Sequence, residues 1–212
     1  KIQEATAVVF IDYKGINVET LTMTDNPITV YPVEFAKSKS KIGFVNMRGC
    51  RLSDVPKEAF EGENVKYLMS LDLSYNHLDD LPYEFHAAHM PYFYGIDLSY
   101  NRFSQFPFEP FDCASLTMMA IRGQRDENGQ RCLKEWPTGV YNHTGLRALY
   151  LGSNDLGKID DTISYLIYYL DISDNPNIVF DASEICYQWM NGVYFLLYDK
   201  TQDIRGCEAM LY

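Results

Sequence analysis

The stretch LMSLDLSYNHLDDLPYEF, residues 68–85, decides the fold of this chain. Leu71 and Leu73 are two positions apart, as on one face of a β-strand. Asn76 follows at a turn, and the apolar residues after it recur at a wider spacing. The positions expected to point inward are Leu68, Leu71, Leu73, Leu78, Leu81 and Phe85. The pattern predicts one coil, in which a short strand turns at Asn76 and a looser segment returns.

The same unit, L-x-x-L-x-L-x-x-N-x-L-x-x-L-P-x-x-x-F, recurs along the chain. Its asparagine position, which we call the ladder position, is occupied by Asn26, Cys50, Asn76, Asn101, Gln124, Asn154 and Asn175. Successive ladder positions are 24, 26, 25, 23, 30 and 21 residues apart, close to the roughly 20–29 residues of one class of coiled repeat. The repeats predict an α/β solenoid of about seven coils, with a parallel sheet on one side and short helical or 3₁₀ segments on the other.

The ladder residue is expected to lie inside its coil. An asparagine amide has two donor hydrogens and an acceptor oxygen, which can bond the backbone of the turn and of the next coil. Loss of one such buried partner should cost about 1–3 kcal/mol. Cys50 and Gln124 replace asparagine at two rungs, and we expect Cys50 to be a buried free thiol.

The repeat pattern also predicts the domain boundaries. Residues 18–180 carry the repeats, and residues 181–212 read as an irregular last coil with a C-terminal cap. Residues 1–17 are either an N-terminal cap over the apolar end of the stack or the remnant of an upstream domain. Residues 125–132 are a polar insertion, which is expected to loop out of one edge. It is either a functional loop or a tolerated surface insertion.

Composition narrows the classes of partner. The formal net charge of −11 argues against a nucleic-acid partner, because phosphate binding requires Lys and Arg. The sequence has no run of about 20 apolar residues, so this segment is not expected to insert into a membrane. The 17 tyrosines and 12 phenylalanines either fill the coil interior or supply a recognition surface.

The cysteine count is odd. If Cys50 is buried and free, the other four allow two bridges, Cys113–Cys132 and Cys186–Cys207. Both bridges would be absent in a reducing compartment.

Alternation along each predicted strand places the residues between the inward leucines on the concave surface. The resulting candidate binding residues are Arg48, Asp72, Tyr75, Asp97, Tyr100, Arg122, Tyr150, Tyr169 and Asp171. Tyr75 and Tyr100 fall at equivalent positions of neighbouring coils, as do Asp72 and Asp97, so this strip is acidic and aromatic. Such a surface suits a peptide or protein with basic and apolar groups, or a glycan stacked on the tyrosines. Alternatively, the aspartates belong to the repeat consensus D-L-S-x-N and have a structural role.

No catalytic constellation is recognisable. His86 and His89 are three residues apart, which would place them on one face of a helical turn, but a third metal ligand is missing. Asp126, Asn128 and Gly129 partly match a calcium loop, without the remaining ligand spacing. The sequence therefore predicts no enzyme, no cofactor and no metal.

The motifs LDLSYNHLDDLP (71–82) and IDLSYNRFSQFP (96–107) resemble leucine-rich repeat proteins, and the resemblance covers residues 18–178. It implies a curved, right-handed superhelix that binds proteins on its concave strands, here at Tyr75, Tyr100, Arg122, Tyr150 and Tyr169. The acidic, Tyr-rich, irregular coils resemble secreted or surface-anchored repeat proteins of gut Gram-negative bacteria. That resemblance implies an extracellular or cell-surface location, with a lipid anchor on another segment as one means of attachment.

The function implied is a non-enzymatic module that binds a protein or peptide. The alternatives are a structural spacer or a glycan-binding domain within a larger cell-surface protein.

Overall fold

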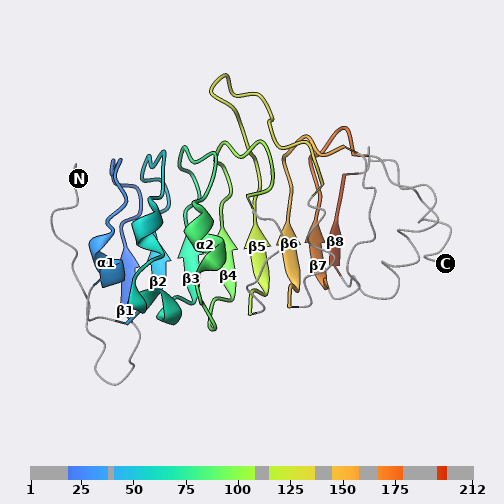
Figure 1. The fold of residues 1–212 in the computed structure, drawn as a ribbon. Helices are drawn as coiled ribbons and strands as arrows, with labels where there is room; N and C mark the ends of the chain where they lie inside the picture. Colours follow the sequence, from blue (N-terminus) through green and yellow to red (C-terminus); the bar gives the residue numbers. More distant parts are fainter. Residues whose placement is uncertain are drawn as a thin grey trace. The chain divides into compact units, whose positions relative to one another are not determined.

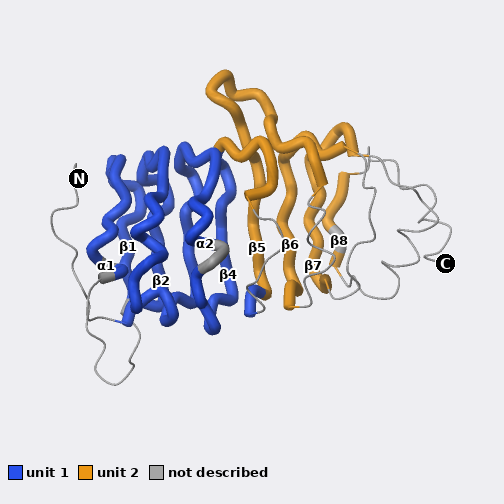
Figure 2. Tube along the Cα trace, in the orientation of Figure 1, with its two compact units in different colours: residues 1–101, 112–116 blue, residues 102–111, 117–212 orange. Residues whose placement is uncertain are grey.

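The computed structural model describes residues 19–37, 41–107, 115–136, 145–157, 167–178 and 195–199. The chain forms two compact units (Figure 2). Unit 1 contains residues 1–101 and 112–116, and unit 2 contains residues 102–111 and 117–212. The predicted cap at residues 1–17 lies outside the described residues, as does most of 181–212.

Unit 1 is a stack of coils with its strands on one side (Figure 1). The strands are β1 (Glu19–Thr22), β2 (Ile42–Asn46), β3 (Ser70–Asp72) and β4 (Gly95–Asp97). Each strand pairs in parallel with the next along the chain. The return segments contain α1 (Glu34–Lys37), η1 (Lys57–Ala59), η2 (Glu63–Tyr67) and α2 (Tyr83–Ala87). The η elements are 3₁₀ helices.

Unit 2 repeats the arrangement. Its strands are β5 (Met118–Ala120), β6 (Ala148–Tyr150), β7 (Tyr169–Asp171) and β8 (Phe195–Leu197). They also pair in parallel, each with the next. The predicted solenoid of stacked coils is confirmed. The described residues hold eight strands, one more than the seven coils predicted, because β8 adds a strand beyond the last ladder asparagine.

The core of each coil is formed by the apolar positions of the repeat. Leu71 and Leu73 have no exposed surface, as expected for the inward face of a strand and the turn after it. Full burial of such a side chain contributes about 1.5–3 kcal/mol. On the return side, Phe60 packs edge-on against Phe85 with ring centroids 5.0 Å apart. Pro82 is the N-cap of α2, where its missing N–H leaves no unmet hydrogen bond.

The ladder amides join each coil to the one before it. Asn76 Oδ1 accepts hydrogen bonds from the N–H groups of Cys50 and Leu52, at 3.1 and 2.9 Å. Its Nδ2 donates to the carbonyls of Met47 and Leu73, both at 2.9 Å. Asn101, Asn154 and Asn175 likewise each accept a backbone N–H of the preceding coil and donate to one of its carbonyls. The expected bonds to the next coil are therefore replaced by bonds to the preceding one.

Two ladder positions hold a residue other than asparagine, and both side chains are buried and hydrogen-bonded inside the coil. The Cys50 side chain is fully buried, and its Sγ donates to the carbonyl of Met23 at 3.0 Å. Gln124 is also fully buried, and its Oε1 accepts from the N–H of Phe103 at 3.1 Å. Asn26, at the first rung, is partly exposed and donates to carbonyls of its own coil.

The 125–132 insertion is a short hairpin closed by an antiparallel bridge between Arg125 and Arg131. Asp126 Oδ1 accepts from two backbone N–H groups inside it, at 2.9 and 2.8 Å. Arg131 Nη1 donates to the carbonyl of Asn154 at 2.7 Å, and Nη2 pairs with Asp174 Oδ1 at 2.6 Å. The hairpin is therefore tied to the ends of the next two coils rather than held only at its base.

Candidate functional site

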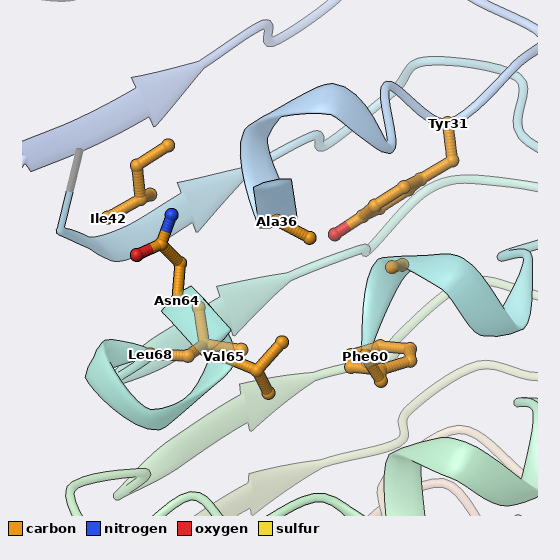
Figure 3. Close-up of a pocket in the computed structure, with 8 residues that line it drawn as sticks. Tyr31, Ala36, Ile42, Phe60, Asn64, Val65 and Leu68 are labelled. Atoms are coloured by element: carbon orange, nitrogen blue, oxygen red, sulfur yellow. The ribbon is translucent and has the colours of Figure 1, made fainter. Parts of the chain in front are cut away.

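One pocket lies inside unit 1, between α1, η1 and η2 (Figure 3). It is lined by Tyr31, Ala36, Ile42, Ala59, Phe60, Asn64, Val65 and Leu68. Its volume is about 10 Å³, which is room for one water molecule at most. An organic ligand does not fit there.

The unit 1 strand face, defined here as Arg48, Asp72, Tyr75, Asp97 and Tyr100, holds an ordered stack of side chains. The rings of Tyr75 and Tyr100 stack with centroids 4.2 Å apart and planes inclined by 28°. The guanidinium of Arg48 lies 3.9 Å from the centroid of Tyr75. Two groups this close to one centroid must lie on opposite faces, so Tyr75 is sandwiched. It presents its ring edge and hydroxyl, and its side chain is 43% exposed.

Both tyrosines have a left-handed backbone, with φ of 57°. This conformation costs a non-glycine residue roughly 1–2 kcal/mol. The residue just before the ladder position has a positive φ in every coil. The occupants of this column are Asp25, Gly49, Tyr75, Tyr100, Gly123, Ser153 and Asp174. Glycine, which adopts this backbone at no steric cost, is thus replaced by a large exposed aromatic residue in two adjacent coils.

The aspartates of this face each use one oxygen within their own coil. Asp72 Oδ1 accepts from the N–H and the Oγ of Ser74, at 2.9 and 2.6 Å. Asp97 Oδ1 accepts from the N–H of Ser99 at 2.8 Å. Asp72 and Asp97 are register partners on β3 and β4. Burial raises the pKa of Asp97 and the Asp72 charge raises it further, while bonds from Ser99 and the charge of Arg48 lower it.

The unit 2 strand face consists of Arg122, Tyr150, Tyr169, Asp171 and Phe195. Arg122 Nη2 pairs with Asp171 Oδ2 at 2.5 Å, and its guanidinium lies 4.6 Å from the centroid of Tyr150. The ring of Tyr169 lies 4.9 Å from that of Tyr150 and 6.1 Å from that of Phe195, centroid to centroid. Asp171 is 3% exposed, so its carboxylate is part of the framework of this face.

Gly152 makes room for that carboxylate. A Cβ on Gly152 would lie 3.0 Å from Asp171 Oδ2 and 3.1 Å from Ser173 Oγ. Sequence reasoning placed Arg122, Tyr150 and Asp171 in one row but missed the ion pair and the need for glycine. The signal available in the sequence was Gly152, a residue without a side chain two positions after Tyr150.

Two cysteines, Cys50 and Cys132, lie within the described residues, and neither forms a disulfide there. Cys132 has a free thiol in this structure, and its Sγ donates to the carbonyl of Phe103 at 3.3 Å. The Cys113–Cys132 bridge stays a prediction. Burial raises the pKa of the Cys50 and Cys132 thiols. The remaining predicted bridge residues, Cys113, Cys186 and Cys207, lie outside the described residues.

Among the described residues, no group of three or more His, Cys, Asp or Glu side chains is placed to hold a metal ion. None of the helices in that part of the chain has the length and apolar character needed to cross a bilayer.

Comparison with known proteins gives a consistent picture. The sequence model of the family Leucine Rich Repeat matches residues 67–87. A leucine-rich repeat protein from Bacteroides thetaiotaomicron VPI-5482 is 39% identical with a TM-score of 0.82, over 94% of this chain and 24% of its own. One from Bacteroides eggerthii DSM 20697 is 43% identical with a TM-score of 0.82, over 93% of this chain and 33% of its own. The chain thus spans a quarter to a third of these relatives.

Human 5T4 (Wnt-activated inhibitory factor 1, Trophoblast glycoprotein) is 18% identical with a TM-score of 0.55, over 85% of this chain and 76% of its own. At that identity the likeness concerns the fold alone. No curated protein matches the chain.

Proposed function

Because the chain belongs to the leucine-rich repeat family, we propose that it is a non-enzymatic module that binds a protein or peptide on its strand surface. The fold is commonly a scaffold for protein interactions. The observation that carries the proposal is the Tyr75–Tyr100 stack, in which two exposed aromatic residues occupy backbone positions that favour glycine. The left-handed backbone recurs before each of the seven ladder residues and so belongs to the repeat. The use of a large exposed aromatic residue at this position in two adjacent coils, where glycine would be unstrained, is what points to a role beyond packing.

The geometry of the stack favours a protein over a glycan as the ligand. A sugar ring stacks on the open face of an aromatic ring, but both faces of Tyr75 are covered, by Arg48 and by Tyr100. What Tyr75 offers is its ring edge and hydroxyl, which suit the mixed polar and apolar surface of a protein. The face therefore supports protein or peptide recognition first.

The test is a pair of matched double variants. Tyr75→Gly with Tyr100→Gly removes both rings while satisfying the left-handed backbone, so folding should be retained. Tyr83→Ala with Tyr92→Ala removes two exposed tyrosines from other parts of unit 1. Proteins captured from the native environment are identified by mass spectrometry, and each is purified for measurement of its Kd.

We expect the Tyr75 and Tyr100 variant to weaken the Kd at least about tenfold, as for aromatic hot spots, and the control to leave it unchanged. Equal Kd values for the wild type and the Tyr75 and Tyr100 variant would remove the strand face of unit 1 from the binding site. Enzyme turnover by the wild-type chain would contradict the non-enzymatic part of the proposal.

We also propose that the module works outside the cell or at the cell surface. The support is the resemblance of its acidic, Tyr-rich coils to secreted and surface-anchored proteins of gut bacteria. Protease treatment of intact cells that produce the full protein should degrade this segment. Its complete protection in intact cells, with degradation after lysis, would place it inside.

A further inference from the structure

The two strand faces contain copies of one arrangement around an aspartate. Asp171 stands four residues before its ladder asparagine, as Asp72 and Asp97 do before theirs. Its Oδ1 accepts from the N–H and the Oγ of Ser173, at 3.0 and 2.6 Å. Asp72 Oδ1 makes the same two bonds with Ser74, at 2.9 and 2.6 Å. In these coils, therefore, one oxygen of the carboxylate holds the turn.

In unit 2 the second oxygen binds a guanidinium. Arg122 reaches Asp171 Oδ2 at 2.5 Å while lying over the ring of Tyr150 at 4.6 Å. A charge-assisted bond and a cation–π contact thus act on the same guanidinium. The chain itself shows that this position in the coil accepts an arginine side chain supported by a tyrosine.

In unit 1 the aspartate–serine arrangement occurs twice, on the adjacent strands β3 and β4, without an ion pair to the aspartate. Among the described residues, neither Asp72 nor Asp97 forms a salt bridge. Arg48, the nearby cation, instead stacks on Tyr75 and donates to Ser74 Oγ at 3.2 Å. Two half-buried carboxylates therefore lie on adjacent strands beside a pair of stacked tyrosines. The charge of Asp72 raises the pKa of Asp97 and the charge of Arg48 lowers it, so one cation already acts on Asp97 and a second would stabilise its charged form further.

We propose that the unit 1 strand face binds an arginine side chain of the partner protein, with its guanidinium at Asp72 and Asp97, beside the exposed edge of the tyrosine stack. This proposal rests on the proposed function and specifies the chemistry of the partner. Arginine fits better than lysine, because its planar guanidinium presents several donors in a fixed fork that matches the geometry of carboxylates. Charge complementarity with the two carboxylates excludes an acidic segment at this position.

The test uses a labelled Gly-Ser peptide that carries arginines, with lysine and glutamine versions, and measures fluorescence anisotropy. Asp72→Asn with Asp97→Asn removes the charges but keeps an acceptor oxygen for the serine N–H groups. Asp54→Asn with Asp79→Asn removes the same charge from two exposed sites off this face. We expect the arginine peptide to bind about fivefold more weakly to the Asp72 and Asp97 variant, and within about twofold of wild type to the control.

The lysine peptide should bind about threefold more weakly than the arginine peptide, and the glutamine peptide should not bind. Equal losses in the two aspartate variants, equal binding of the arginine and lysine peptides, or no binding of the arginine peptide up to about 1 mM would overturn the inference. A protein partner lost from the tyrosine variant but kept by the Asp72 and Asp97 variant would overturn it as well, while leaving the proposed function intact.

Discussion

Replacing Asn76 by alanine tests whether the ladder amides hold the stack together. The change leaves the buried N–H groups of Cys50 and Leu52 without their acceptor and the carbonyl of Met47 without its donor. The carbonyl of Leu73 keeps a second donor, the Nδ2 of the next ladder asparagine, so it does not add to the loss.

Each buried polar group that loses its partner costs about 1–3 kcal/mol. Three such groups, taken at the lower bound, predict a loss of about 3 kcal/mol in the free energy of unfolding. Asn46→Ala is the matched control, because the Asn46 amide is half-exposed and accepts from Thr24 Oγ1 and the N–H of Arg48. Water can replace those bonds, so its loss should be about 1 kcal/mol or less.

The assay is urea denaturation followed by circular dichroism, with m-values compared so that the two variants refer to the same transition. Equal losses for Asn76→Ala and Asn46→Ala would refute the reasoning. That result would mean that the apolar positions alone set the stability of the stack, and that a buried ladder amide contributes no more than a half-exposed amide.

Three further outcomes follow from the structure. Gly152→Ala should lower the free energy of unfolding by about 1–2 kcal/mol in the same assay, because the new methyl group must displace the Asp171 carboxylate. Arg131→Ala should speed protease cleavage within 126–130 by freeing the hairpin, with little change in global unfolding. Asp97→Asn should stabilise the protein at neutral pH, because burial and a neighbouring carboxylate raise the pKa of Asp97 and disfavour its charged form in the fold. That gain should shrink as the pH falls through the folded pKa and vanish below the unfolded value of about 3.9, as measured by thermal unfolding across pH.

The regular part of the fold follows from spacing alone. Leu71 and Leu73 specify the inner side of a strand and its turn, and the recurrence of Asn76 fixes the parallel order of coils. The direction of the ladder bonds does not follow, because the same spacing is compatible with bonds to either neighbour. Only the positions of the backbone groups inside the coil decide that each amide turns toward the preceding coil.

The candidate site was predictable in outline and not in its chemistry. Alternation identifies the column that holds Tyr75 and Tyr100, but the left-handed backbone there is signalled only by Gly49 and Gly123 in equivalent positions. The ion pair of Arg122 depends on how far a long side chain reaches over an intervening strand. No repeat pattern carries that information. The hairpin at 125–132 was likewise predicted as a protrusion, while its arginine anchors depend on contacts distant in sequence.

The shared left-handed column means that this surface can change its specificity one residue at a time. Neighbouring strands are about 4.8 Å apart, close to the 4.2 Å between the two tyrosine rings. Aromatic residues placed in successive coils therefore meet without any rearrangement of the main chain. Glycine, serine, aspartate and tyrosine already share the column, so a duplicated coil could acquire a new side chain there and extend or interrupt the stack while the scaffold stays the same.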